Sequence, residues 1–157
     1  RERRERMPEV DGIWVSPLKR CRQTAELLFP GMEQRIVPDL QECDFGDYEC
    51  KTWEELKDEE IYRAWIGGDM TITFPHGESM EHFIARCRRG IQTVAQEAKA
   101  LGLERPAIVA HGGTWLVVMG TFGRPERKLY DWQVKNCGGF RVSVQENPFT
   151  LKLLEEL

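Results

Sequence analysis

Short apolar runs alternate with segments of helical periodicity along the chain, which is the pattern of an α/β protein. The runs at 12–15 (Gly-Ile-Trp-Val) and 107–110 (Ala-Ile-Val-Ala) contain no polar side chain. Apolar runs without alternation are typical of strands covered on both faces, as in parallel sheets. The predicted strands are 12–15, 35–37, 107–110, 140–144 and 150–154.

Apolar residues at a spacing of about 3.6 positions predict the helices. Ser16 suits the N-cap of the first helix and Pro17 its first position, and Pro30-Gly31 ends it. Ser79 begins the longest helix, which Gly102 stops. The predicted helices cover 17–29, 52–66, 79–101, 114–120 and 126–132. Because most of these helices stand between strands, we expect a βαβ-like order throughout.

The composition is that of one globular domain, which we predict to span residues 1–157. Hydrophobic residues make up 41% and charged residues 31%, enough for a sizeable core. The formal net charge of -4 gives no electrostatic reason to bind nucleic acid or an anionic membrane surface. The most apolar window, 114–122, is far shorter than the roughly 20 residues of a spanning helix. The mixed charges of residues 1–6 indicate a solvated helix face.

Cysteine and histidine usage argues against disulfides, metals and cofactors. The five cysteines are odd in number, scattered and never spaced C-x-x-C, which fits neither a disulfide framework nor a zinc site. A reducing, cytoplasmic compartment is the expectation that follows. The three histidines show no ligand spacing, so we expect no metal and no cofactor.

A candidate phosphate site follows the strand at 107–110. The strand leads into His111 and turns through Gly112-Gly113 into a helix. Amide donors, the positive end of a helix and an imidazole thus meet at one point, which suits a phosphate group. Ligands of open α/β sheets also bind beyond the carboxyl ends of the strands. The alternative is a tight turn with His111 as a buried, hydrogen-bonded side chain.

Arginine can reach the same edge of the sheet from the first predicted helix. Arg20 lies one turn into this helix, after the strand at 12–15. Its planar guanidinium is suited to binding two phosphate oxygens at once. The spacing does not separate Arg20 from Arg22, and a solvent-exposed arginine is the alternative.

Several acidic side chains are candidates for proton transfer or substrate contact. A carboxyl group in a cleft can stay neutral and protonate a leaving oxygen, and Glu42 is the first candidate. Asp44 and Asp47 compete with it, and a solvated acidic loop is the alternative. Glu78 either contacts substrate or favours the positive end of the helix that Ser79 caps.

Four motifs occur in order along the chain. They are Ser-Pro-Leu-Lys-Arg-Cys-Arg-Gln-Thr-Ala at 16–25, Glu-Cys-Asp-Phe-Gly-Asp-Tyr-Glu at 42–49, Gly-Glu-Ser at 77–79 and Ala-His-Gly-Gly at 110–113. Together they resemble the histidine phosphatase superfamily, or phosphoglycerate-mutase-like family, and within it the branch of α-ribazole phosphatase and small cytoplasmic sugar-phosphate phosphatases. The resemblance covers essentially the whole chain. It implies a three-layer αβα fold with a mostly parallel central sheet that lacks its first strand.

The resemblance also implies a reaction, the hydrolysis of a small phosphorylated metabolite through a phosphohistidine. The metabolite would be α-ribazole phosphate or a sugar phosphate. Arg20 would clamp the phosphate, Glu42 would protonate the leaving alkoxide, and His111 would bind the phosphoryl oxygens as the second histidine. The further residues that the resemblance implies near the substrate are Gly112, Glu78 and Ser79.

One departure from the family pattern concerns the nucleophile. The attacking histidine of the family lies in an R-H-G motif on the first strand, and no R-H-G occurs in these 157 residues. We therefore expect that the N-terminal portion is missing and that this chain alone is inactive. The alternative enzyme is a phosphoglycerate mutase, but family mutases carry a longer insertion where 34 residues, 43–76, separate Glu42 from Gly77. The alternative to an enzyme is a phosphate-binding module, and the oligomeric state is not predicted.

Overall fold

The computed structural model describes residue 5 and residues 7–157, so the helix face predicted at 1–6 lies outside the described residues except for Glu5. The chain divides into two compact units, 1–42 with 87–157 and 43–86, and each is described by itself. The single domain expected over 1–157 stays a prediction.

The first unit contains a parallel sheet of three strands in the order β2-β1-β3. The strands are β1 (Gly12–Val15), β2 (Gln34–Ile36) and β3 (Pro106–Val109). All three lie within one residue of their predicted positions. All four residues of β1 are buried, which explains why the run at 12–15 is apolar without alternation and why it was predicted correctly. Among the described residues, β3 pairs with β1 alone and β2 forms the opposite edge.

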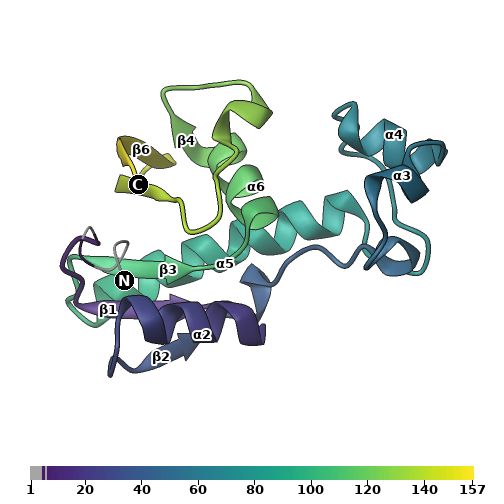
Figure 1. Cartoon of the computed structure of the whole chain (residues 1–157). Coiled ribbons are helices and arrows are strands. Elements are labelled where there is room, and N and C mark those ends of the chain that lie inside the picture. The colour runs from purple at the N-terminus through teal and green to yellow at the C-terminus, as the bar shows by residue number, and fades with distance from the viewer. Residues whose placement is uncertain (1–4, 6) are drawn as a thin grey trace. The chain divides into compact units, whose positions relative to one another are not determined.

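Helices cover both faces of this sheet, which gives the three αβα layers (Figure 1). Because successive side chains of a strand point to opposite faces, Ile13 and Val15 pack with α2 (Lys19–Leu28) while Trp14 packs with α5 (Met80–Ala100). Two buried clusters result. The cluster on the α2 side is Ile13, Val15, Cys21 and Ala25, and the one on the α5 side is Trp14, Val37, Leu40, Val94 and Ala98.

A second sheet of three strands completes the first unit, in the order β4-β6-β5. It consists of β4 (Gly123–Arg124), β5 (Phe140–Glu146) and β6 (Phe149–Glu156). The prediction of a βαβ-like order throughout is wrong here, because the two-residue connection at 147–148 can join only antiparallel neighbours. Three of the four strand pairings among the described residues are parallel, which agrees with the predicted mostly parallel α/β fold.

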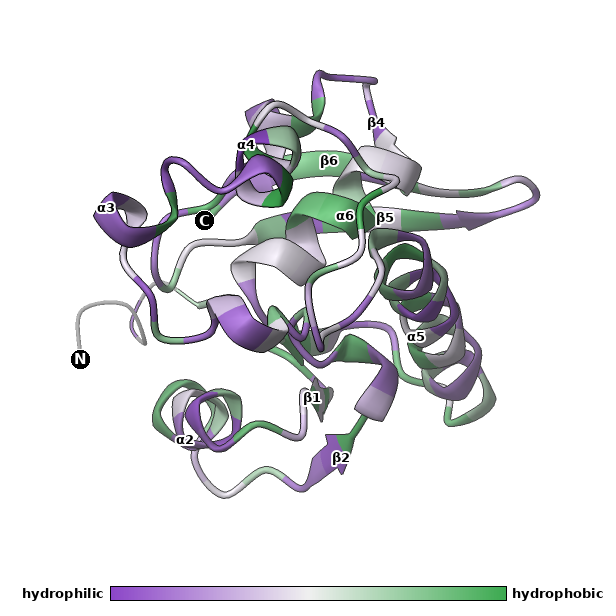
Figure 2. Cartoon of the chain, turned by 90° about the vertical axis from the view of Figure 1, so that its right-hand side faces the viewer, coloured by the Kyte–Doolittle hydropathy of each residue, from purple (hydrophilic) through white to green (hydrophobic). Residues whose placement is uncertain are grey.

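Helix α6 (Gly112–Phe122) follows β3 and is largely apolar, as its green colour in Figure 2 shows. Val117, Val118 and Met119 are buried. The helix begins two residues before the predicted start because His111 is its N-cap. Short 3₁₀ turns at η1 (Pro38–Leu40) and η3 (Leu129–Trp132) complete this unit, and η3 falls within the helix predicted at 126–132.

The second unit replaces the single helix predicted at 52–66 by two, α3 (Trp53–Leu56) and α4 (Glu60–Ile66), after a 3₁₀ turn at η2 (Gly46–Tyr48). The run at 57–59, Lys-Asp-Glu, contains no apolar side chain that could hold a continuous helix against a core. Aromatic rings form that core at centroid distances of 5.1 to 6.4 Å. They belong to Phe45, Tyr48, Tyr62, Trp65 and Phe74.

The two ends of the segment 48–74 are joined backbone to backbone. The amide of Asp47 donates to Pro75 O at 2.9 Å, and the amide of Glu78 donates to Asp44 O at 2.9 Å. A Cβ atom at Gly46 would lie 2.1 Å from Pro75 O. One at Gly77 would lie 2.5 Å from the carbonyl oxygen of residue 44. Both positions therefore require glycine, because no side chain fits between the two backbones.

Candidate active site

The carboxyl ends of β1 and β3 bring two polar side chains together in the first unit. Val15 is opposite Val109 in the parallel register, and the amide of Ser16 donates to Val109 O at 2.9 Å. The chain after each strand then contributes Ser16 and His111, which are both buried. Their side chains meet at 2.7 Å, between Ser16 Oγ and His111 Nε2.

Ser16 is therefore not the N-cap that its position predicted. Helix α2 begins at Lys19 with Leu18 as its N-cap, and no side chain caps it. The amide of Leu18 lies 3.4 Å from Ser16 Oγ, a long contact. The side chain of Ser16 points instead to the imidazole of His111, a role that no local sequence signal indicates.

Arg20 reaches the other side of the same imidazole. Its Nε donates to His111 Nδ1 at 3.2 Å from the first turn of α2. This contact separates Arg20 from Arg22, which the spacing had left open. Because arginine remains protonated at any accessible pH, Nδ1 is the acceptor and carries no proton. The neutral ring then carries its proton on Nε2 and donates it to Ser16 Oγ, an assignment that follows from the hydrogen-bond network.

The thiol of Cys21 lies beside the imidazole. Its Sγ lies 3.6 Å from His111 Nδ1 and 3.5 Å from Nε2, and it donates to Ala110 O at 3.3 Å. Burial raises the pKa of Cys21, and the positive charge of Arg20 only partly opposes this shift. Cys21 therefore remains a thiol and is a poor nucleophile.

Glu42 lies at the N-terminus of α6. The amide of Gly113 donates to Glu42 Oε2 at 3.4 Å. A Cβ atom at residue 113 would lie only 2.5 Å from Glu42 Oε1, whereas one at Gly112 would meet nothing within 4 Å. Glycine at 113 thus allows the carboxyl group to approach the helix end, and no neighbouring atom crowds the Cβ direction at Gly112. Imidazole, guanidinium, carboxyl and helix end are all contributed by the first unit.

The two competing acids have other partners, within the second unit. Asp44 Oδ1 accepts from the amide of Gly46 at 2.9 Å, and Asp47 Oδ2 lies 2.9 Å from His76 Nδ1. These contacts belong to the closure of segment 48–74.

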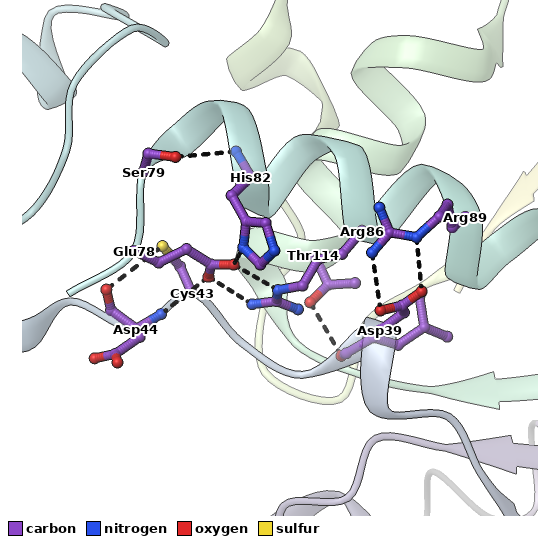
Figure 3. A network of polar contacts seen from close by, with 10 residues as sticks. Asp39, Cys43, Asp44, Glu78, Ser79, His82, Arg86, Arg89 and Thr114 are labelled. Atoms are coloured by element: carbon purple, nitrogen blue, oxygen red, sulfur yellow. Dashed lines mark hydrogen bonds and ion pairs between the residues drawn. The ribbon is translucent and has the colours of Figure 1, made fainter.

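Glu78 and Ser79 also belong to the second unit and are described only there (Figure 3). Arg86 binds Glu78 through two hydrogen bonds of 2.7 Å, and His82 Nδ1 contacts Glu78 Oε1 at 2.5 Å. Burial alone would raise the pKa of Glu78, but the hydrogen bonds from Arg86 and His82 outweigh it, so the pKa is lowered. Ser79 Oγ accepts from the amide of His82 at 3.1 Å, which confirms the predicted cap.

Arg86 was not predicted from the sequence. Its side chain is only 10% exposed, as is appropriate for the buried partner of a carboxylate. The available signal was an arginine beside the apolar stripe of the long helix, next to Cys87. The sequence offered two roles for Glu78, contact with substrate or interaction with the positive helix end, and neither included its main partner, Arg86.

Residue 5 and residues 7–157 contain neither a metal-binding cluster nor a membrane-spanning helix. No group of three or more histidine, cysteine, aspartate or glutamate side chains there is arranged to hold a metal ion. No helix in these residues is long and apolar enough to cross a membrane.

Comparison with solved structures shows how widely the architecture is shared. The α-ribazole phosphatase of Shigella flexneri matches 98% of this chain and 80% of its own with a TM-score of 0.73 at 25% identity. A crystal structure of phosphoglycerate mutase from Thermus thermophilus matches 99% of this chain and 77% of its own with a TM-score of 0.70 at 27% identity. The chain therefore has a phosphoglycerate-mutase-like fold.

Relatives with similar sequences identify the family to which the chain belongs. The adenosylcobalamin/alpha-ribazole phosphatase of Salmonella typhimurium is 30% identical over 149 residues, which cover 92% of this chain and 72% of the relative. A broad-specificity phosphatase of Saccharomyces cerevisiae is 30% identical over 121 residues, 74% of this chain and 50% of the relative. The model of the histidine phosphatase superfamily (branch 1) matches residues 2–157. The chain therefore belongs to the histidine phosphatase superfamily.

Proposed function

We propose that this chain contributes most of the active site of a phosphatase that hydrolyses a small phosphorylated metabolite through a phosphohistidine. The observation that carries the proposal is the contact of Arg20 with His111 beside the N-terminus of α6. A guanidinium, an imidazole and an open helix end within a few ångströms form a site for a phosphate dianion. The metabolite is α-ribazole phosphate, as the name of the Salmonella relative suggests, or a sugar phosphate, as the resemblance of the motifs implies.

Each side chain has a role in the proposed reaction. Arg20 binds the equatorial phosphoryl oxygens, and the amide of Gly112 donates to them. His111 donates a hydrogen bond to the phosphoryl group as charge develops in the transition state. Glu42, next to Gly113, protonates the departing alkoxide oxygen. The contact of Glu78 and Ser79 with substrate stays a prediction.

The attacking histidine belongs to a segment outside this sequence. Covalent transfer needs a neutral imidazole that attacks phosphorus and is then regenerated by water. His111 is already bonded at both ring nitrogens, and the printed sequence contains no R-H-G motif. We propose that such a motif, on a further strand, supplies the nucleophile and that the 157 residues alone do not turn over. The absence of such a strand also fits the unpaired edge of β3 in the described chain.

The test compares the 157-residue chain with a longer version that also contains an R-H-G strand. The longer chain is expected to hydrolyse p-nitrophenyl phosphate, and acid-quenched samples should contain an acid-labile phosphohistidine. His111→Ala or Glu42→Gln should then slow turnover by about 10² to 10⁴. Turnover by the 157 residues alone, or the absence of phosphohistidine in the active longer chain, would contradict the proposal.

A phosphoglycerate mutase is the second candidate, because the fold neighbour from Thermus thermophilus carries that name. The short segment between Glu42 and Gly77 argues against it. Mutase activity on 3-phosphoglycerate without phosphatase activity would favour it. Phosphate binding by the longer chain without either activity would indicate a binding module instead.

A further inference from the structure

We propose that Ser16 is a positioning residue for His111, because its buried hydroxyl holds Nε2 and so turns Nδ1 toward Arg20 and the phosphate ester. The inference rests on the proposed function, which uses Arg20 and His111 but gives Ser16 no part. Ser16 is 0% exposed, and its Oγ lies 2.7 Å from Nε2, the shortest of the polar contacts described for this imidazole.

The backbone leaves Ser16 little freedom to do anything else. Its amide is bonded to Val109 O, so the end of β1 is fixed against the end of β3 three residues before α2 begins at Lys19. The same pairing fixes the position from which the chain continues into His111. The two side chains therefore meet because the strand register sets their backbones, and a neighbouring residue cannot substitute for either.

A hydroxyl group is chemically suited to this position because it can both donate and accept. In the ligand-free chain Arg20 donates to Nδ1, so Nε2 carries the proton and Ser16 Oγ accepts it. When phosphoryl oxygens bind Arg20, Nδ1 must carry a proton in order to donate to them. The ring then changes tautomer, with one proton lost at Nε2 and one gained at Nδ1 and no net change in charge, and the Ser16 hydroxyl turns to donate to Nε2. The ring keeps its orientation in both tautomers.

The other neighbour of the ring cannot replace Ser16. The sulfur of Cys21 is 3.5 and 3.6 Å from the two nitrogens and favours neither. A thiol is also only a weak donor and acceptor. Cys21 therefore limits the space below the ring without selecting which nitrogen faces Arg20.

The tautomer of His111 can be measured directly by ¹⁵N NMR of the histidine rings in the 157-residue chain. His111→Ala identifies its signals among the three histidines. We expect a protonated Nε2 and an unprotonated Nδ1 without ligand. Arg20→Ala should give a mixture of tautomers. Ser16→Ala should shift both nitrogens and weaken binding of inorganic phosphate by about 2- to 10-fold, the effect of one lost hydrogen bond, and Ser16→Thr should restore both.

Ser143→Ala, which removes a hydroxyl from β5, is the matched control and should change neither the ring signals nor phosphate binding. A protonated Nδ1 in the ligand-free wild type would overturn the proposal even if Ser16→Ala does not fold. A folded Ser16→Ala with wild-type ring signals would overturn it as well. Failure of the proposed function is separable, because an inactive longer chain would leave the tautomer of His111 in the ligand-free chain as predicted.

Discussion

Exchanging each of two adjacent glycines for alanine tests the position of Glu42. Alanine is favoured over glycine in a helix by about 0.5 to 1 kcal/mol. Gly112→Ala should therefore stabilise the protein, since its Cβ would meet nothing within 4 Å. Gly113→Ala brings the same helical gain, but its Cβ would lie 2.5 Å from Glu42 Oε1 and would displace the carboxyl group.

The difference between the two variants measures what the displaced carboxyl group contributes. It loses a long hydrogen bond of 3.4 Å, worth at most about 1 kcal/mol, and an interaction with the helix end of about 0.3 to 1 kcal/mol. Gly113→Ala should thus be about 0.3 to 2 kcal/mol less stable than Gly112→Ala in urea unfolding followed by circular dichroism. The gap should close when both are made in a Glu42→Ala background. Equal stabilisation by the two alanines, or a gap that persists without Glu42, would refute the reasoning.

Three further predictions concern burial and charge. The lowered pKa of Glu78 means that its carboxylate stabilises the fold above the unfolded value of about 4.3 and that this contribution is lost as the pH falls through the folded pKa. Glu78→Gln leaves Arg86 without its carboxylate, so in urea unfolding the variant should be less stable than the wild type at pH 7 and should lose less stability on acidification. An equal loss of stability with falling pH in both proteins would contradict this. Iodoacetamide should label the exposed Cys50 of the native protein rapidly and the buried Cys21 only after unfolding, as measured by peptide mass mapping. Equal labelling of the two cysteines in the native protein would exclude a buried Cys21. Trp14→Phe removes an indole N–H that donates to a carboxylate of α5 at 2.7 Å, and it should cost about 1.5 to 3 kcal/mol in the same unfolding assay; a loss below about 0.5 kcal/mol, well under the range for a bond to a charged group, would contradict that bond.

The strands and helices of the first unit could be predicted because their side chains face two covered surfaces. The runs around Trp14 and Ile108 carry apolar side chains on both faces of the sheet, and no turn-forming residue interrupts them. The break in the helix at 57–59 was missed, although Leu56 and Ile61 are five positions apart and so depart from the spacing of three or four that places apolar side chains on one helix face. The apolar residues on either side of the break belong to two helices, α3 and α4.

The candidate site was predictable only where residue type and strand end coincide. His111 and Arg20 follow buried strands directly, so their positions follow from the topology of parallel sheets. The hydroxyl of Ser16 was instead assigned to a helix cap, because sequence alone cannot show a partner 95 residues away. Arg86 was missed for a related reason, since its carboxylate lies in a loop before the helix.

The backbone closure between Gly46 and Gly77 has a consequence for how new specificities can arise. The segment 48–74 leaves and re-enters the fold at one point, and its ends are held by their own amides and carbonyls. Its length can therefore vary while this closure is kept, provided that Phe45 retains an aromatic partner in the place of Trp65. Related chains can in this way differ in a single insert, and the two glycines mark where such an insert begins and ends.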